Sequence, residues 1–226
     1  MRRVVTTDRL VLTSPTFPRS SLDEILAVAK PFDPEGHYLY PADLQGSHLK
    51  GFFAFEPIAR HPAFVAQIVG DIASWAHERA GDFDVIFAPA SPAVRVLANA
   101  VAAAVGKEVA YWEYRPSGRF GDRLADGSVT PGSRAIVFNA VSLNGRCVGN
   151  RLPAFVERLG GSVVAAAVFA KGTAEQVRET ERRWGDRFYS AVQADVPIYE
   201  ADACEMCMSG RGHPIPWTAF AQGRLA

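Results

Sequence analysis

The stretch "SRAIVFNAVSLNGRCVG", residues 133–149, has the order of a strand, a short polar loop and a helix start. Residues 135–138 are four consecutive apolar residues, which is the pattern of a buried strand. A polar turn with Gly145 follows, and a helix is expected from about residue 147. Backbone N–H groups at such a helix start are suited to bind phosphate. The stretch therefore predicts a phosphate-binding loop between a strand and a helix.

The chain around this stretch repeats the strand–helix order. Apolar runs predict strands at 84–90, 108–114, 134–138 and 162–170. Amphipathic patterns predict helices at 61–81, 92–108 and 147–161. Continuous apolar strands that alternate with helices predict a parallel sheet covered on both faces, and ligands of such sheets bind at the carboxyl ends of the strands. We therefore expect the site in the loops after Phe87, Tyr114 and Phe138.

The composition is that of an ordinary globular protein. The chain of 226 residues has 48% hydrophobic and 21% charged residues, and its 24 basic residues balance 24 acidic ones. A nucleic-acid-binding groove usually needs a basic excess, so we expect no nucleic-acid partner. The longest apolar run, residues 162–170, is too short to cross a bilayer, and the N-terminus lacks the apolar core of a signal peptide. These features predict a cytoplasmic protein without a membrane segment.

The cysteines give one short motif. Cys204 and Cys207 form a C-x-x-C, whereas a structural zinc site needs four ligands and no second C-x-x-C is present. His213 is available as a third ligand, but a fourth is not evident. The histidines show no spacing typical of a metal or catalytic site: His37, His48, His61, His77 and His213. A C-terminal turn without metal is therefore the favoured interpretation, and a metal or redox role is the alternative.

Five stretches occur in an order that resembles a known enzyme family. They are residues 36–51 ("GHYLYPADLQGSHLKG"), 58–76, 84–114, 131–170, and the tail at 199–216 ("YEADACEMCMSGRGHPIP"). Together they resemble the type I phosphoribosyltransferases, and among these the orotate phosphoribosyltransferases. The resemblance implies an α/β fold with a mainly parallel sheet flanked by helices and a small irregular N-terminal hood. It divides the chain into a hood segment at 1–60, a phosphoribosyltransferase-like core at 61–200 and a C-terminal tail at 201–226.

The resemblance also implies which residues bind a phosphorylated ribose. In this family two adjacent acids hold the ribose hydroxyls of phosphoribosyl diphosphate, and the turn after them cradles the 5′-phosphate. Here Asn139 and Ala140 replace the acids, and neither can carry a charge. The phosphate half depends on backbone N–H groups and keeps Gly145. The implied phosphate- and ribose-binding residues are Asn139, Ser142, Leu143, Asn144, Gly145, Arg146 and Cys147.

Two further loops depart from the family pattern. The implied pyrophosphate loop holds Ala90 and Ser91, and it continues with Pro92 in place of a glycine, so one N–H donor is missing. Within a polar, glycine-rich loop at 115–132, the basic stretch "YRPSGRFGDR" at 114–123 is implied to be a mobile loop that closes over the diphosphate, with Arg115 and Arg119 as catalytic residues. The alternative is a solvated, hairpin-like excursion. Near the base site, Asp43 would repel the carboxylate of orotate.

The function expected from this resemblance is binding of phosphoribosyl diphosphate or a nucleotide, with transfer of the phosphoribosyl group in an active enzyme. The missing acid pair counts against Mg²⁺ as a cofactor and against orotate as the acceptor. A catalytically retired nucleotide-binding or partner subunit is the alternative, since relaxed selection would alter all three ligand loops together. An enzyme repurposed for a different phosphosugar is a third possibility. A homodimer is implied by the resemblance alone.

Overall fold

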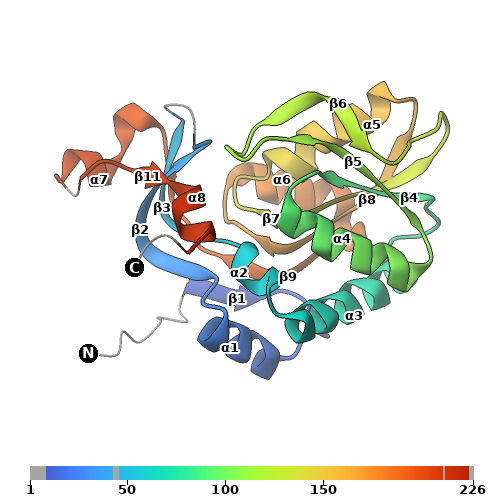
Figure 1. Ribbon diagram of the computed structural model, residues 1–226, viewed down its shortest axis with the longest axis horizontal. Coiled ribbons are helices and arrows are strands. Elements are labelled where there is room, and N and C mark those ends of the chain that lie inside the picture. Colours follow the sequence, from blue (N-terminus) through green and yellow to red (C-terminus); the bar gives the residue numbers. More distant parts are fainter. Residues whose placement is uncertain (1–8, 43–45, 211, 224–226) are drawn as a thin grey trace.

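The structure is a computed structural model that describes residues 9–42, 46–210 and 212–223. Two sheets form the molecule, and Figure 1 shows the smaller one at one end of the larger. In spatial order, the large sheet contains β1 (Leu10–Leu12), β9 (Phe188–Ala194), β8 (Ser162–Lys171), β7 (Arg134–Ser142), β4 (Val85–Pro89), β5 (Glu108–Tyr114) and β6 (Phe120–Asp126).

The large sheet confirms the predicted α/β fold with a mainly parallel sheet. Strands β9, β8, β7, β4 and β5 are parallel to their neighbours, and the edge strands β1 and β6 are antiparallel. The helices that connect consecutive parallel strands are α4 (Pro92–Val105), α5 (Leu152–Arg158) and α6 (Glu175–Trp184), and α3 (Pro62–Arg79) leads from the small sheet into β4. A parallel connection needs such a crossover, so the strand–helix alternation of the sequence dictates this topology.

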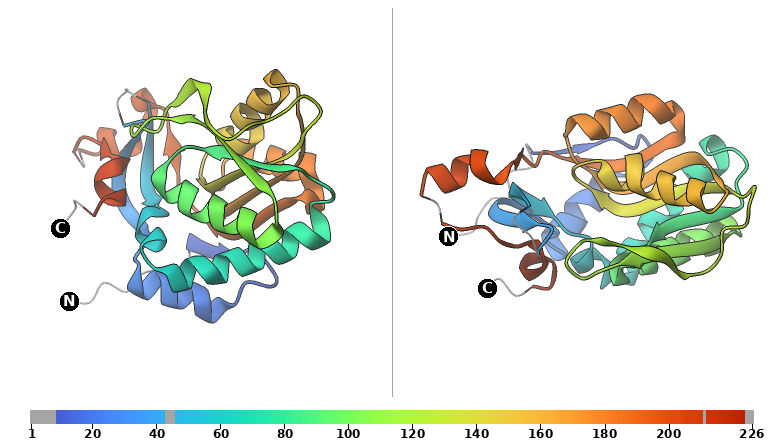
Figure 2. Two further views of the ribbon diagram at one scale, coloured as in Figure 1. Left: turned by 45° about the vertical axis from the view of Figure 1, so that its right-hand side comes forward. Right: turned by 90° about the horizontal axis from the view of Figure 1, so that it is seen from above.

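Both faces of the sheet are buried. Along β4, Ile86 packs with α3 and α4 on one face, and its neighbour Phe87 packs with α5 on the other. This alternation follows from the two-residue period of a strand, and burial of both faces explains why the strands are continuously apolar. The right-hand view of Figure 2 shows α5 and α6 on one side of the sheet and α4 on the other.

The hood is a sheet, whereas the sequence was expected to give an irregular segment. Its spatial order is β10 (Ile198–Tyr199), β3 (Ser47–Phe53), β2 (Phe32–Tyr40) and β11 (Ile215–Pro216). The glycine and proline residues near 34–36 are absorbed in a bulge between Asp33 and His37, so they do not end the strand. Strands β10 and β11 come from the end of the chain. The proposed hood and tail therefore form one unit.

The remaining helices are short or peripheral. They are α1 (Arg19–Val28), α2 (Glu56–Ala59), α7 (Glu205–Met208) and α8 (Trp217–Ala221), and a π-helical turn at Cys147–Arg151 precedes α5. Among the described residues, no helix combines the length and the apolar character needed to span a membrane.

Candidate functional site

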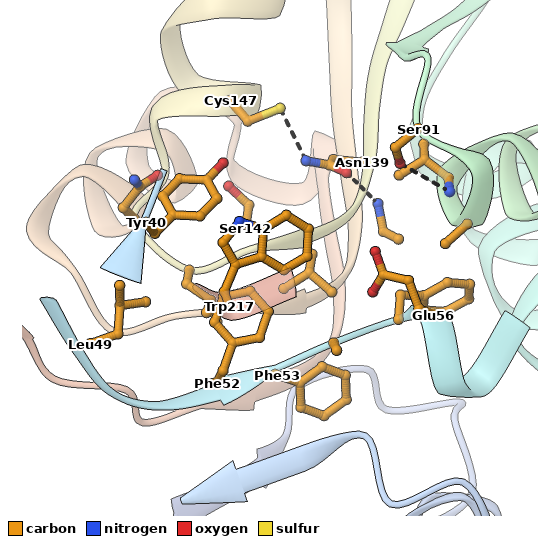
Figure 3. A pocket seen from close by; sticks show the side chains of 18 of the residues that line it. Tyr40, Leu49, Phe52, Phe53, Glu56, Ser91, Asn139, Ser142, Cys147 and Trp217 are labelled. Carbon is orange, nitrogen blue, oxygen red and sulfur yellow. Dashed lines mark hydrogen bonds between the residues drawn. The ribbon is translucent and has the colours of Figure 1, made fainter. Parts of the chain in front are cut away.

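A pocket lies between the hood and the carboxyl ends of β4, β5 and β7. Its volume is about 750 Å³, including the open mouth. Ser91 follows β4, Tyr114 ends β5, and Asn139 and Ser142 lie at the end of β7, and all four line the pocket. Figure 3 shows Ser91, Asn139 and Ser142 of the core together with Tyr40, Phe52 and Trp217 from the hood. The pocket therefore lies at the edge of the sheet where the sequence predicts the site.

The pocket contains six of the eleven predicted site residues. Those that line it are Ser91, Asn139, Ser142, Leu143, Asn144 and Cys147. Those outside its lining are Ala90, Arg115, Arg119, Gly145 and Arg146. The ribose- and phosphate-binding loop is thus largely present at the pocket, whereas the two predicted catalytic arginines do not reach it in this chain.

The side chain of Asn139 makes two hydrogen bonds to neighbouring groups of the protein. Its side-chain oxygen accepts a hydrogen bond from the backbone N–H of Ala140 at 2.8 Å, and its amide nitrogen donates to Sγ of Cys147 at 3.1 Å. The side chain is only 9% exposed. Ala140 presents a methyl group to the pocket. The two adjacent positions of the pocket floor, 139 and 140, are therefore neutral, and their one polar side chain is already hydrogen-bonded.

The loop after β7 has a built-in turn. The side chain of Asn144 accepts the backbone N–H of Arg146 at 3.1 Å, so one of the donors available to a phosphate is already capped. Gly145 has a φ of +76°, and a Cβ there would lie 2.6 Å from the backbone nitrogen of Val177. Only glycine fits this close approach between the loop and α6.

Ser142 supplies an unpaired polar group at the pocket. The residue is 4% exposed, and its hydroxyl has no hydrogen-bond partner among the described residues. Buried hydroxyl groups are usually hydrogen-bonded, and an exception calls for an explanation. The oxygen itself has almost no accessible surface in this conformation, so a small shift of the loop 142–147 would let a ligand oxygen satisfy the group.

A π-helical turn follows the loop because of a proline. Leu152 donates its N–H to the carbonyl of Cys147, five residues back, and Pro153 has no N–H to continue the ordinary helical pattern. The turn buries Val148 and Gly149 against the rest of the fold. Arg146 lies just before it and is not among the residues that line the pocket, although its charge acts on the hydroxyl of Tyr40.

The predicted pyrophosphate loop is a direct strand-to-helix junction. The N–H of Ala90 donates to the carbonyl of Trp112 at 2.8 Å, which extends the sheet. Ser91 is the N-cap of α4, and its hydroxyl accepts the N–H of Val94 at 3.4 Å. This cap occupies a donor at the helix start that a diphosphate would otherwise contact. The junction leaves less room for a diphosphate than a glycine-rich loop would.

The predicted mobile loop is a β-hairpin between β5 and β6. Its turn is closed by the N–H of Arg115, which donates to the carbonyl of Arg119 at 2.8 Å. Polar residues 120–126 pair with β5 as an exposed edge strand, which has the hairpin form given as the alternative in the sequence analysis, and closure of the turn over a ligand stays a prediction. Arg115 and Arg119 are exposed at the turn.

The hairpin turn contacts the hood beside the pocket, through residues that include the pocket-lining Tyr40 and Trp217. The carbonyl of Ser117 accepts the N–H of Ala42 at 2.8 Å and the indole N–H of Trp217 at 3.4 Å. The hydroxyl of Tyr40 donates to the carbonyl of Gly118 at 3.3 Å. The hood and the hairpin are therefore joined on one side of the pocket.

Aromatic residues of the hood form the wall that sequence reasoning missed. Phe52 and Trp217 are stacked with ring centroids 5.2 Å apart, and Tyr40 lies 6.0 Å from Trp217. All three line the pocket. The residues around a tryptophan do not show whether it packs in the core or lines a pocket. The sequence therefore did not distinguish Trp217, which lines the pocket, from Trp112, which lies in the core. Asp43, the residue predicted near the base, lies outside the described residues.

Glu56 is the acid that lines the described part of the pocket, and sequence reasoning also missed it. It lies at the start of α2 and points toward the floor near Asn139 (Figure 3). Burial raises the pKa of its carboxyl, while backbone N–H groups and Arg60 oppose the shift. A carboxylate here favours ligand groups that donate hydrogen bonds and disfavours a ligand carboxylate.

The other titratable groups of the pocket are neutral at physiological pH. Burial raises the pKa of Tyr40 to about 12 and that of Tyr114 well above its ordinary value. Burial also raises the pKa of the Cys147 thiol to about 12, although the hydrogen bond from Asn139 opposes the shift. A protonated thiol is a poor nucleophile, so Cys147 is not suited to covalent catalysis.

The donor set does not fit Mg²⁺. This ion prefers oxygen ligands in octahedral geometry and is usually bound by one or two carboxylates together with substrate phosphates. Ala140 offers no ligand atom, and the side-chain oxygen of Asn139 is occupied by the N–H of Ala140. Glu56 offers one half-buried carboxylate from α2. The described residues therefore lack the adjacent acids that would hold the ion beside a ribose.

Comparison with known proteins agrees with the geometry. No family model matches the chain. An orotate phosphoribosyltransferase of Thermus thermophilus is 28% identical over 177 residues, which cover 78% of this chain and 89% of the relative. The crystal structure of orotate phosphoribosyltransferase from Aeropyrum pernix has a TM-score of 0.56 at 16% identity, over 75% of this chain and 92% of that one.

A second solved structure extends the comparison to another base. Adenine phosphoribosyltransferase from Trypanosoma brucei, in complex with AMP, pyrophosphate and ribose-5-phosphate, has a TM-score of 0.54 at 13% identity, over 82% of this chain and 87% of that one. The fold alone follows from the structural matches, and the sequence match supports the same family. The chain is a phosphoribosyltransferase-like protein with the type I fold, related in sequence to the orotate phosphoribosyltransferases.

Proposed function

We propose that the pocket binds a phosphorylated ribose, either phosphoribosyl diphosphate or a nucleotide. The observation that carries this proposal is the unpaired hydroxyl of Ser142, which is buried at the carboxyl end of β7 beside the loop 142–147. A ligand phosphate or ribose oxygen would satisfy it. The fold neighbour that was solved with AMP, pyrophosphate and ribose-5-phosphate supports the same ligand class.

The aromatic wall favours a flat, uncharged ring as the other half of the ligand. Tyr40, Phe52 and Trp217 provide ring faces against which a base can stack. Glu56 would repel the carboxylate of orotate and would accept a hydrogen bond from an N–H group of a neutral base. We therefore propose a base or nucleotide other than orotate.

The proposed activity is transfer of the phosphoribosyl group, with a site that does not depend on Mg²⁺. The neutral floor at Asn139 and Ala140 would contact the ribose without a protein-bound ion. Arg115 and Arg119 keep their proposed role at the leaving diphosphate, and this role requires the hairpin turn to move or to reach the pocket of a second copy. A homodimer and a cytoplasmic location are part of the same proposal.

A retired, nucleotide-binding subunit is the second candidate. Three observations favour it: Asn139 is engaged by neighbouring groups, Ser91 caps the helix that a diphosphate would approach, and the arginines lie outside the pocket. Turnover separates the two candidates. Incubation with phosphoribosyl diphosphate and a panel of bases, including adenine and orotate, should release diphosphate if the protein is a transferase. Binding of nucleotides without release on any base would favour the retired subunit.

Replacing Ser142 by Ala should improve stability and weaken binding at the same time. The variant removes a buried hydroxyl that has no partner, so the free energy of unfolding of the ligand-free protein should rise by about 1–3 kcal/mol. The lost hydrogen bond to a charged phosphate should weaken binding of ribose 5-phosphate by about 10- to 100-fold. Urea unfolding and calorimetry measure the two effects.

Thr130→Ala is the control variant, because Thr130 does not line the pocket. Its hydroxyl lies 2.8 Å from that of Ser133. It should leave ligand affinity unchanged. Equal affinities of the wild type and the Ser142→Ala variant would remove the observation on which the proposed ligand class rests.

A further inference from the structure

Four side chains that can bind a metal converge on the outer face of the hood. They are His37 of β2, His48 of β3, Cys204, which directly precedes α7, and Cys207, which lies within α7. Their ligand atoms all lie within 4.8 Å of one another. The sequence interpretation of a metal-free turn overlooked this cluster, and His213, which was considered as a third ligand, is not part of it.

Four of the six distances between the ligand atoms match the edges of a tetrahedron around zinc, and the other two are within 4.8 Å. Nε2 of His37 lies 3.4 Å from Nδ1 of His48, 3.4 Å from Sγ of Cys204 and 3.8 Å from Sγ of Cys207. Nδ1 of His48 lies 3.4 Å from Sγ of Cys207. Tetrahedral zinc with ordinary Zn–N and Zn–S bond lengths places such atoms roughly 3.3–3.8 Å apart.

The surroundings of the cluster also suit a structural metal site. The other ring nitrogen of His37, Nδ1, lies 3.1 Å from the carbonyl of Gly212 and can donate to it. Such a hydrogen bond fixes the tautomer in which Nε2 is free to bind a metal. Cys204 is fully buried and His48 is 7% exposed, whereas His37 is partly buried and Cys207 is exposed at the surface. Two cysteines and two histidines complete four-coordinate zinc and leave no open position for catalysis.

The cluster joins the hairpin β2–β3 to the segment between β10 and β11. The histidines lie on neighbouring strands of the hairpin β2–β3, and the cysteines lie in the segment that connects β10 to β11. That segment begins at one edge of the hood sheet and ends at the other, because β10 pairs with β3 and β11 pairs with β2. Figure 1 shows α7 beside these strands, away from the large sheet.

We propose that His37, His48, Cys204 and Cys207 bind one structural zinc ion that clips the C-terminal segment across the hood sheet. Binding converts the two thiols to thiolates and releases their protons to solvent. The ion would hold the hairpin whose neighbouring residues, Ser47 and Leu49, line the pocket. This inference does not depend on the proposed function, because it concerns a different set of residues.

Metal analysis of the purified, reduced protein tests the site. We expect about one zinc per chain by mass spectrometry, and titration of the zinc-free protein with Co²⁺ should give the visible absorption of tetrahedral cobalt with thiolate ligands. Cys204→Ser and Cys207→Ser should each weaken zinc binding by at least about 100-fold. Cys147→Ser is the matched control, because this third cysteine lies in the pocket and should leave zinc binding unchanged. His213→Ala should also retain the metal.

Thiol titration keeps the test valid if a variant does not fold. In the wild type, zinc should protect Cys204 and Cys207 from a thiol reagent until a chelator is added. Absence of both bound zinc and the cobalt absorption in the folded, reduced wild type would overturn the proposal. A disulfide between Cys204 and Cys207 in the protein as isolated under reducing conditions, or equal zinc binding by Cys204→Ser and Cys147→Ser, would overturn it as well.

Discussion

Replacing Gly145 by Ala is expected to lower the free energy of unfolding by about 2–4 kcal/mol and to abolish binding of phosphorylated ribose. Two effects contribute. The φ of +76° is a left-handed conformation that a residue with a Cβ adopts at a cost of about 1–2 kcal/mol. The new methyl group would also lie 2.6 Å from the backbone nitrogen of Val177 and 2.7 Å from the carbonyl carbon of Gln176.

The close approach of the new methyl group to the backbone of α6 is expected to have the larger effect on ligand binding. Backbone atoms cannot rotate away as the end of a flexible side chain can, so α6 or the loop 142–147 must shift. A shift of this loop moves Ser142 and Asn144, which line the pocket. Urea unfolding gives the stability, and calorimetry with ribose 5-phosphate gives the binding.

Gly132→Ala is the matched control. Gly132 has a similar φ of +87°, but a Cβ there meets nothing within 4 Å. This variant should therefore lose only the conformational cost of about 1–2 kcal/mol and should bind the ligand normally. If the two variants are equally stable and bind equally well, the close approach of the loop to α6 has no role in shaping the pocket.

Restoring the acid pair, in the double variant Asn139→Glu and Ala140→Asp, is expected to make binding of phosphoribosyl diphosphate depend on Mg²⁺. Two ionised acceptors for the ribose hydroxyls and the metal would contribute about 3–6 kcal/mol, which is a gain of about two to four powers of ten in affinity when Mg²⁺ is present. Without the ion, the buried charges beside Glu56 should destabilise the fold by about 3–5 kcal/mol.

The destabilisation should depend on pH in a defined direction. Burial and the nearby Glu56 raise the pKa of the new carboxyl groups in the folded state, so the folded protein binds more protons than the unfolded chain at intermediate pH. The stability of the variant should therefore fall as the pH rises above the ordinary pKa of a carboxyl group. Thermal unfolding at a series of pH values, with and without Mg²⁺, measures this dependence.

The neutral pair Asn139→Gln and Ala140→Asn is the control for size. It has nearly the same volume as the acid pair and no charge, so it should show neither the Mg²⁺ dependence nor the pH dependence. An acid-pair variant that binds phosphoribosyl diphosphate no better with Mg²⁺ than the neutral pair would mean that the phosphate half of the site is also lost.

The central parallel strands could be predicted from sequence because their signal is local. The apolar run of β8 and the strand–loop–helix order around β7 identify buried strands, and the helices between them dictate parallel pairing. The edge strand β6 was missed because its residues are mostly exposed and polar, as an edge strand permits. The hood sheet was missed because β10 and β11 pair with strands that lie more than a hundred residues away.

The same distinction applies to the site. The floor at Asn139 and Ser142 was found through the order of motifs along one continuous segment. Trp217 and Glu56 reach the pocket from other parts of the chain, and nothing in their neighbouring residues marks them as ligand-facing. The metal cluster shows the limit most clearly, because His37, His48 and the two cysteines come from three segments, and only the hood sheet brings them together.

Calorimetric titration of the wild-type protein with phosphoribosyl diphosphate, in the presence and absence of Mg²⁺, tests the central claim most directly. Ribose 5-phosphate and a nucleoside 5′-monophosphate serve as companion ligands. We predict saturable binding of at least one of these ligands, with an affinity that Mg²⁺ changes by less than about tenfold. A folded protein that binds none of them, or that binds phosphoribosyl diphosphate only with Mg²⁺, would contradict a metal-independent site for phosphorylated ribose.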